Sequence, residues 1–128
     1  MMELEKVLKF LNLKKEDIIN QWEAREVDIE YGGKRRKGLL FLTKDELIFV
    51  AEVGVFSKKL KELYRIPILS IKSAGKLPLS KTVRIGYTKA SKEAGFFKKA
   101  FGMRNVGFKI QEPKSLIQKL KELNSKIK

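Results

Sequence analysis

The chain has 128 residues, of which 29 are Lys or Arg and 15 are Asp or Glu, so its net charge is +14 at pH 7. It contains no Cys and no His, which excludes disulfides and thiolate chemistry and removes the commonest general base and metal ligand. At this length one domain with a single core is the most economical organisation, and the abundance of Lys and Glu resembles that of heat-adapted proteins.

The N-terminal segment, residues 3–11, is predicted to be a short amphipathic helix. Its apolar residues follow i, i+3, i+4, i+7 spacing: Leu4, Val7, Leu8 and Leu11. Because such a helix is too short to be stable alone, its stripe must lie on a neighbouring sheet or on a partner chain. Residues 1–15 have neither an uninterrupted apolar core nor a small-residue cleavage site, so no signal peptide is expected.

Residues 18–31 are predicted to form a long first strand. Val27, Ile29 and Tyr31 alternate with acidic residues, whereas Trp22 and Ala24 fall in the opposite phase. That change of phase predicts a β-bulge near Arg25, and a core position is expected for Trp22. The pair Gly32-Gly33 supplies the following turn.

The segment 38–50, G-L-L-F-L-T-K-D-E-L-I-F-V, predicts a hairpin at the centre of the fold. Its two apolar runs, residues 39–43 and 47–50, are separated by only three polar residues. Neither run alternates with polar residues, so we expect both faces of this hairpin to be covered.

Further short strands are predicted at residues 61–66, 68–73, 82–88 and 105–111, separated by Gly and Pro residues. Val53, Val55 and Phe56 can extend the preceding strand. Residues 113–126 form a closing helix with Pro113 at its first turn. Seven short strands followed by a helix predict an antiparallel barrel or sandwich with the helix plugging one open end.

The order of these elements resembles the pleckstrin-homology-like superfamily, in particular its GRAM and bacterial pleckstrin-homology branches. The matching residues are K-E-D-I-I at 15–19, Ala24, G-L-L-F-L-T at 38–43, E-L-I-F at 46–49 and I-P-I-L-S-I at 66–71. The resemblance implies an α+β, mostly β fold, in which a partly open barrel of seven antiparallel strands is capped by the C-terminal helix. The resemblance covers about residues 14–127, and the N-terminal helix and the acidic first strand are not part of its pattern. We expect one domain over residues 1–128, with a helical appendage at 1–13, the barrel at 14–111 and the capping helix at 113–127.

The resemblance further implies a non-catalytic module that binds lipid headgroups, peptides or proteins. In members that bind phosphoinositides, a lysine late in the first strand pairs with a basic-x-arginine motif early in the second. Lys34-Arg35-Arg36 matches the second part of that pattern, whereas the first strand carries Glu26, Asp28 and Glu30 and no Lys in this region.

Positive charge is concentrated after residue 30. Residues 1–30 hold five Lys/Arg and eight Asp/Glu, whereas residues 31–128 hold 24 and seven. This surplus is expected to attract polyanions, although a Lys-rich surface also serves solubility. The densest run comprises Lys34, Arg35, Arg36 and Lys37. It is either a phosphate-binding patch or a charged loop that protects the hairpin from edge association.

A second candidate site is the basic and aromatic segment 89–104. Its proposed anion- or lipid-binding residues are Lys89, Lys92, Phe96, Lys98, Lys99 and Arg104. Basic residues beside aromatic rings suit a bilayer interface, and the same combination can stack single-stranded bases. Phe97 and Phe101 have helical i, i+4 spacing and are expected to pack onto the barrel as a lid, which leaves Phe96 exposed.

The sequence favours a binding module over an enzyme. Its serines have no His base, and no metal, phosphate-loop or dinucleotide motif occurs, so neither a cofactor nor a metal is expected. The leading hypothesis is docking on anionic membrane headgroups. A protein-interaction or self-associating module with an acidic partner or a second copy is the alternative, and non-specific nucleic-acid binding is third. A cytoplasmic protein, at times peripheral to the membrane, is expected.

Overall fold

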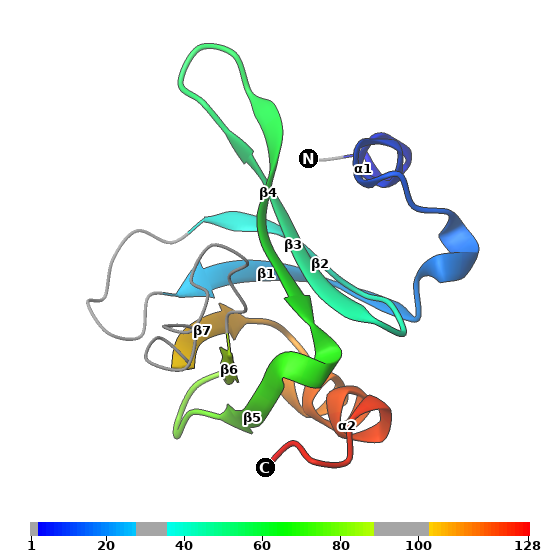
Figure 1. Cartoon of the computed structure of the whole chain (residues 1–128). Helices are drawn as coiled ribbons and strands as arrows, with labels where there is room; N and C mark the ends of the chain where they lie inside the picture. Colours follow the sequence, from blue (N-terminus) through cyan, green and yellow to red (C-terminus); the bar gives the residue numbers. More distant parts are fainter. Residues whose placement is uncertain (1–2, 28–35, 89–102) are drawn as a thin grey trace, which may run out of the picture.

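The computed structural model describes residues 3–27, 36–88 and 103–128. These residues form one antiparallel sheet of seven strands in the order β4-β3-β2-β1-β7-β6-β5, with a helix at each end of the chain (Figure 1). The strands are β1 Asn20–Val27, β2 Lys37–Leu42, β3 Glu46–Val53, β4 Lys59–Pro67, β5 Ile71–Lys76, β6 Thr82–Thr88 and β7 Met103–Lys109. The helices are α1 Leu4–Leu11 and α2 Pro113–Leu123, and two 3-10 turns lie at Lys15–Asp17 and Ile68–Ser70.

The sheet curls into a partly open barrel. Strands β4 and β5 lie at opposite edges of the sheet, yet only the three residues Ile68–Ser70 connect them along the chain. Such a short connection requires the two edges to approach each other. The predicted mostly β fold with a closing helix is therefore confirmed.

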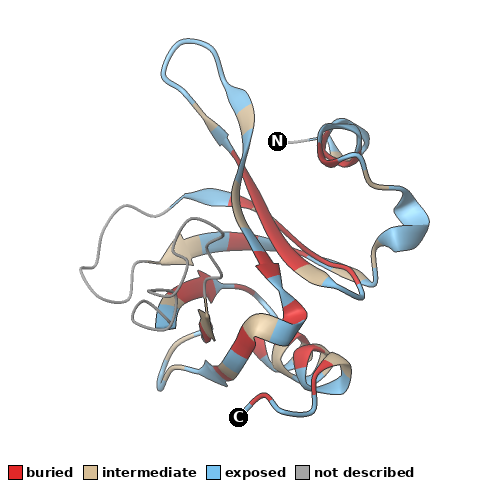
Figure 2. Ribbon diagram, viewed as in Figure 1, coloured by how far each residue is buried: buried red, intermediate tan, exposed pale blue. Residues whose placement is uncertain are grey.

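The inner face of the sheet and helix α2 enclose the main core. Leu40, Phe49 and Phe108 from three strands are completely buried together with Leu116 and Leu120 of α2. The ring centroids of Phe49 and Phe108 are 5.1 Å apart, within the range of favourable aromatic pairs. Figure 2 shows this buried side of the sheet and of α2 in red. Trp22 belongs to the same core, as predicted.

The outer face of the central hairpin is covered by α1. Val7, Leu8 and Leu11 of the helix pack with the fully buried Phe41 and other side chains of β2 and β3. Both faces of the hairpin are thus covered, as its non-alternating apolar runs predicted. Because the helical stripe is used within the chain, it no longer argues for a partner chain.

The C-terminal residues secure the β4–β5 corner. The buried Asn124 donates hydrogen bonds from Nδ2 to the carbonyl oxygens of Ile68 (3.0 Å) and Ile71 (3.4 Å). The backbone of Lys128 then pairs with the free edge of β5, donating to the carbonyl oxygen of Lys72 and accepting from the amide of Ala74. This pairing protects an edge strand from pairing with other chains.

The structure corrects the predicted bulge near Arg25. Strand β1 pairs with β2 in one continuous register through Arg25. Trp22, Ala24 and Glu26 share one phase, and the Glu26 carboxylate accepts a hydrogen bond from Tyr64. That hydrogen bond lets a polar residue occupy an inward position, so β1 needs no extra residue up to Val27, and Ile29 and Tyr31 lie outside the described residues. The observed register shifts lie between Phe49 and Val50 against β4 and between Ile71 and Ser73 against β6.

Two other boundaries differ from the prediction. The predicted strand at residues 68–73 begins as the 3-10 turn Ile68–Ser70, because the chain must cross there between the two sheet edges. Strand β5 then starts at Ile71 and continues to Lys76, three residues beyond the predicted end at residue 73. In the described part of the chain, no helix has the length and hydrophobicity needed to cross a membrane.

Candidate functional site

Three positive side chains lie directly opposite one another on adjacent strands. Arg25 of β1 pairs with Lys37 of β2 on one side and with Lys109 of β7 on the other. All three are exposed, and we call them the basic row. Like charges in directly opposed positions destabilise a sheet. Within residues 3–27, 36–88 and 103–128, the ion pairs join Lys6 to Glu3 and Arg65 to Glu46 and Glu62, so none neutralises the basic row.

Strand periodicity places the basic row on the outer face. Successive side chains of a strand point to opposite faces, and Trp22 and Ala24 of β1 are buried while Arg25 is exposed. In the same way Lys109 of β7 follows the buried Phe108. The cations therefore face away from the core, on the same side of the sheet as α1.

Two adjoining hollows surround the basic row. The larger, of about 930 Å³, lies over β1 and β2 between Leu4 of α1 and Lys58 beyond β3. The smaller, of about 230 Å³, lies over β1 towards Lys81 and Lys109. They share Glu23, Arg25 and Lys37, and we call them together the basic groove. Its charged lining residues are Arg25, Arg36, Lys37, Lys58, Lys81 and Lys109, with Glu23 and Glu52 as the carboxylates.

The charge of the groove favours anions. Six cations against two carboxylates line it, and Arg side chains bind phosphate or carboxylate groups with two parallel hydrogen bonds. The apolar Leu4 and Leu39 add a non-polar contact beside these charges. The groove is therefore suited to a phosphate-bearing ligand with an apolar portion.

The inner face of the barrel near the end of β1 has different chemistry. The hydroxyl of Tyr64 donates a hydrogen bond of 2.6 Å to Oε2 of Glu26. Glu26 is the second-last residue of β1 and is half-buried. Tyr87 on β6 pairs with Arg104 on β7. Burial raises the pKa of the Tyr87 phenol, and the charge of Arg104 opposes part of that increase. Among the described residues, the inner face near the end of β1 therefore carries one carboxylate, Glu26, and one cation, Arg104, and lacks the excess of positive charge that lines the basic groove.

The structure brings together part of the predicted site. Arg36 and Lys37 both line the basic groove, whereas Arg104 lies beside Tyr87 and is not among the groove residues. The remaining predicted residues lie outside the described part of the chain: Lys34, Arg35, Lys89, Lys92, Phe96, Lys98 and Lys99. Their role stays a prediction.

Sequence reasoning missed Arg25, Lys58, Lys81 and Lys109. These residues belong to four separate segments, and none of them lies in a basic run as dense as residues 34–37. The available signal was the polar phase of the amphipathic strands, which predicts the face of each cation but not its neighbours. Only the strand register shows that Lys37, Arg25 and Lys109 are adjacent.

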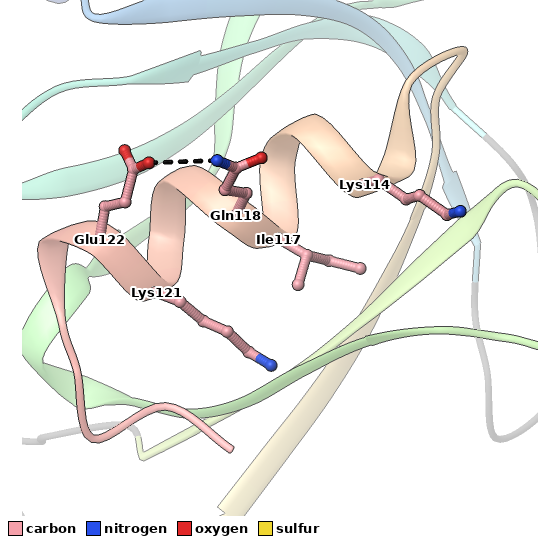
Figure 3. A pocket seen from close by; sticks show the side chains of 5 residues that line it. All are labelled: Lys114, Ile117, Gln118, Lys121 and Glu122. Atoms are coloured by element: carbon pink, nitrogen blue, oxygen red, sulfur yellow. Dashed lines mark hydrogen bonds between the residues drawn. The ribbon is translucent and has the colours of Figure 1, made fainter.

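A third hollow is drawn in Figure 3, and all of its described lining residues belong to α2. It has a volume of about 480 Å³ and is lined by Lys114, Ile117, Gln118, Lys121 and Glu122. Figure 3 shows Lys121 and Ile117 on one side of the helix, while Gln118 donates a hydrogen bond of 3.4 Å to Glu122. Because no second element among the described residues contributes a side chain, we regard this hollow as the flank of a helix and not as a convergent site.

Comparison with known proteins identifies the fold. No family model matches the sequence, and no curated protein is significantly similar to it. The C-terminal domain of an unknown protein from Leishmania infantum is similar, with a TM-score of 0.58 and 12% identity over 93% of this chain and 92% of that domain.

The Slm1 PH domain is also similar. Its complex with phosphoserine has a TM-score of 0.56 and 16% identity over 85% of this chain and 97% of that domain. Its complex with D-myo-inositol-4-phosphate has a TM-score of 0.57 and 12% identity over 84% and 96%. The chain therefore has a PH-like fold, which confirms the predicted resemblance at the level of the fold, while the GRAM assignment stays a prediction.

Proposed function

We propose that this protein is a non-catalytic binding module that docks on anionic membrane surfaces through its basic groove. The observation that carries the proposal is the basic row, in which Arg25 lies between Lys37 and Lys109 and none of the three takes part in an ion pair among the described residues. Adjacent like charges weaken the sheet, so the basic row does not contribute to the stability of the fold. We therefore assign it a role in binding an anion.

A lipid headgroup supplies the missing countercharge. A phosphate group accepts bidentate hydrogen bonds from Arg25 or Arg36, while Lys37 contributes a point charge. Near an anionic membrane each basic residue contributes about 1 kcal/mol. Several cations on one exposed face therefore give substantial binding without an enclosed pocket.

The ligands of the structural neighbours support this chemistry. The Slm1 PH domain forms complexes with phosphoserine and with inositol-4-phosphate, which are both phosphorylated and anionic. In this chain the inner face near the end of β1 has Glu26 as well as Arg104, whereas six cations and two carboxylates line the basic groove, so we assign the anion to the outer face. Lys34 and Arg35 immediately precede Arg36 in the sequence, and we propose that they extend the same surface.

We favour a membrane over nucleic acid because the groove lacks a stacking platform. Proteins that bind single strands combine positive charge with exposed aromatic rings. The only aromatic residue among the described lining of the groove is Trp22, which is 8% exposed and belongs to the core. Leu4 and Leu39 offer aliphatic contacts instead.

The test is co-sedimentation of the full chain with liposomes. Anionic and zwitterionic vesicles are compared at low and near-physiological salt, with a single-stranded oligonucleotide as competitor. The proposal predicts binding to anionic vesicles that persists at near-physiological salt and is not displaced by the oligonucleotide. Binding that disappears with salt, or that the oligonucleotide displaces, would reduce the interaction to general charge attraction. Acidic proteins and self-association would then be tested.

A further inference from the structure

The turn that connects β3 to β4 carries two apolar side chains that are almost fully exposed. Val55 is 88% exposed and Phe56 is 102% exposed. Figure 1 shows this connection extending away from the body of the sheet, and Figure 2 shows it as exposed. We call residues 54–57 the hairpin tip. Sequence reasoning placed Val55 and Phe56 in an extension of the strand, so their exposure is unexpected.

The shape of the hairpin tip is set by its backbone. Gly54 has φ +119°, a conformation that L side chains rarely adopt, and a Cβ there would lie 2.3 Å from the carbonyl oxygen of Ser57. The turn therefore requires glycine. The register shift between Phe49 and Val50 against β4 lies below the tip, and such irregularities bend and twist a hairpin. The two apolar side chains are thus presented by a formed turn, which limits the entropy lost on binding.

Positive charge surrounds the hairpin tip. Residues 52–61 contain three Lys and one Glu, and Lys58, Lys59 and Lys61 are all exposed. Lys58 also lines the basic groove, so the charged face continues from the groove to the tip. Apolar side chains flanked by Lys match a bilayer interface, where rings enter the acyl boundary and ammonium groups remain among the headgroups.

A folded protein partner fits this feature less well. A specific protein interface buries about 800 Å² on each partner, whereas the tip offers two apolar side chains on a projecting turn. A bilayer imposes no such requirement, because its interior accepts single side chains.

We infer that the hairpin tip inserts into the interfacial layer of an anionic membrane, with Phe56 as its main apolar anchor. This inference rests on the proposed function and adds a defined point of insertion. Electrostatic attraction by the groove brings the protein to the surface, and burial of Val55 and Phe56 then holds it there. Because apolar burial is not screened by salt, the tip accounts for the salt-resistant part of binding.

The experiment places a fluorescent reporter at the tip. The only native tryptophan, Trp22, is buried, so Phe56→Trp reports on position 56 against a constant background. Leu69→Trp is the matched control, because Leu69 is 79% exposed and lies at the β4–β5 corner. Vesicles of phosphatidylcholine and phosphatidylserine are used, with brominated phosphatidylcholine as the quencher.

We expect vesicles to shift the emission of the Phe56→Trp variant to the blue and to quench it, while the Leu69→Trp variant changes little. Equal responses of the two variants, with sedimentation retained, would overturn the insertion of the tip and leave the proposed function standing. If the wild-type chain does not sediment with these vesicles, both the function and the insertion are wrong.

A second pair of variants measures the contribution to binding. Phe56→Ser is expected to weaken vesicle binding about tenfold or more at near-physiological salt, since a buried Phe side chain contributes on this scale. Leu69→Ser is expected to bind as the wild type does. Phe56 has no packing to lose, so the thermal unfolding of the Phe56→Ser variant should be unchanged. Equal binding by the two Ser variants would overturn the inference.

Discussion

The hydroxyl of Tyr64 donates a hydrogen bond of 2.6 Å to the carboxylate of Glu26, which places a negative charge on the inner face of the barrel near the end of β1. On the opposite face of the same strand, Arg25 stands between Lys37 and Lys109. One strand therefore presents a carboxylate inward and a cation outward. This separation is the reason to look for the anion on the outer face.

Removing the Tyr64 hydroxyl should affect stability and not binding. Tyr64→Phe loses a charge-assisted hydrogen bond and is expected to lower the free energy of unfolding by about 1–2 kcal/mol. The change is measured by urea unfolding. Affinity for anionic vesicles should equal that of the wild type, because the hydroxyl is directed inward. A clear loss of vesicle binding by the folded variant would argue for an inner binding site.

Removing the central cation of the basic row should increase stability. Arg25→Gln relieves repulsion with both Lys37 and Lys109 and is expected to raise the free energy of unfolding by about 0.2–1 kcal/mol at low salt. The gain should shrink at high salt, where these exposed charges are screened. The same variant should bind anionic vesicles more weakly. Lower stability at low salt would show that repulsion in the basic row is unimportant.

The buried amide of Asn124 should be a major support of the β4–β5 corner. Asn124→Leu keeps a branched side chain but leaves the carbonyl oxygens of Ile68 and Ile71 without this donor, at a cost of about 1–3 kcal/mol. Gln118→Ala on the exposed side of α2 serves as the control and should change stability by less than about 0.5 kcal/mol. Similar unfolding midpoints for the two variants would exclude this role.

The phenol of Tyr87 should make the protein less stable in alkali. Burial raises the pKa of the Tyr87 phenol in the folded state, and the positive charge of Arg104 offsets part of that rise. The neutral phenol therefore favours folding below the unfolded pKa of about 10, and this contribution is lost as the pH rises through the folded pKa. Tyr87→Phe should lose stability less steeply between about pH 9 and 11. Stability is measured by urea unfolding at each pH. If the wild type and the Tyr87→Phe variant lose stability equally over this range, the alkaline loss does not come from Tyr87.

Local patterns in the sequence were sufficient to predict most of the elements of the fold. The apolar runs of the central hairpin lack alternation because the barrel core covers one face of the hairpin and α1 covers the other. The helical stripe that contains Val7 and Leu11 packs on the second of these faces. The ends of the strands were harder to predict, because they depend on contacts between residues that are distant in sequence. The 3-10 turn Ile68–Ser70 exists because the chain crosses between sheet edges, which no local pattern indicates.

The candidate site was harder to predict than the fold. Arg36 and Lys37 belong to a dense basic run that is conspicuous in the sequence, whereas Arg25 and Lys109 are single cations brought together by strand register. Phe56 was missed for a different reason. The β-forming residues beside it suggested a strand, whereas the chain turns at Gly54 and leaves the Phe56 ring exposed.

The most direct test of the account compares two variants that each lose three positive charges. One is Arg25→Gln/Lys37→Gln/Lys109→Gln in the basic row, and the other is Lys72→Gln/Lys114→Gln/Lys121→Gln on β5 and α2. Liposome co-sedimentation at near-physiological salt is the measurement. At about 1 kcal/mol per charge, the basic-row variant should lose on the order of 100-fold in affinity for anionic vesicles, and the control should lose far less. Equal losses would show that total charge, and not the basic groove, governs binding.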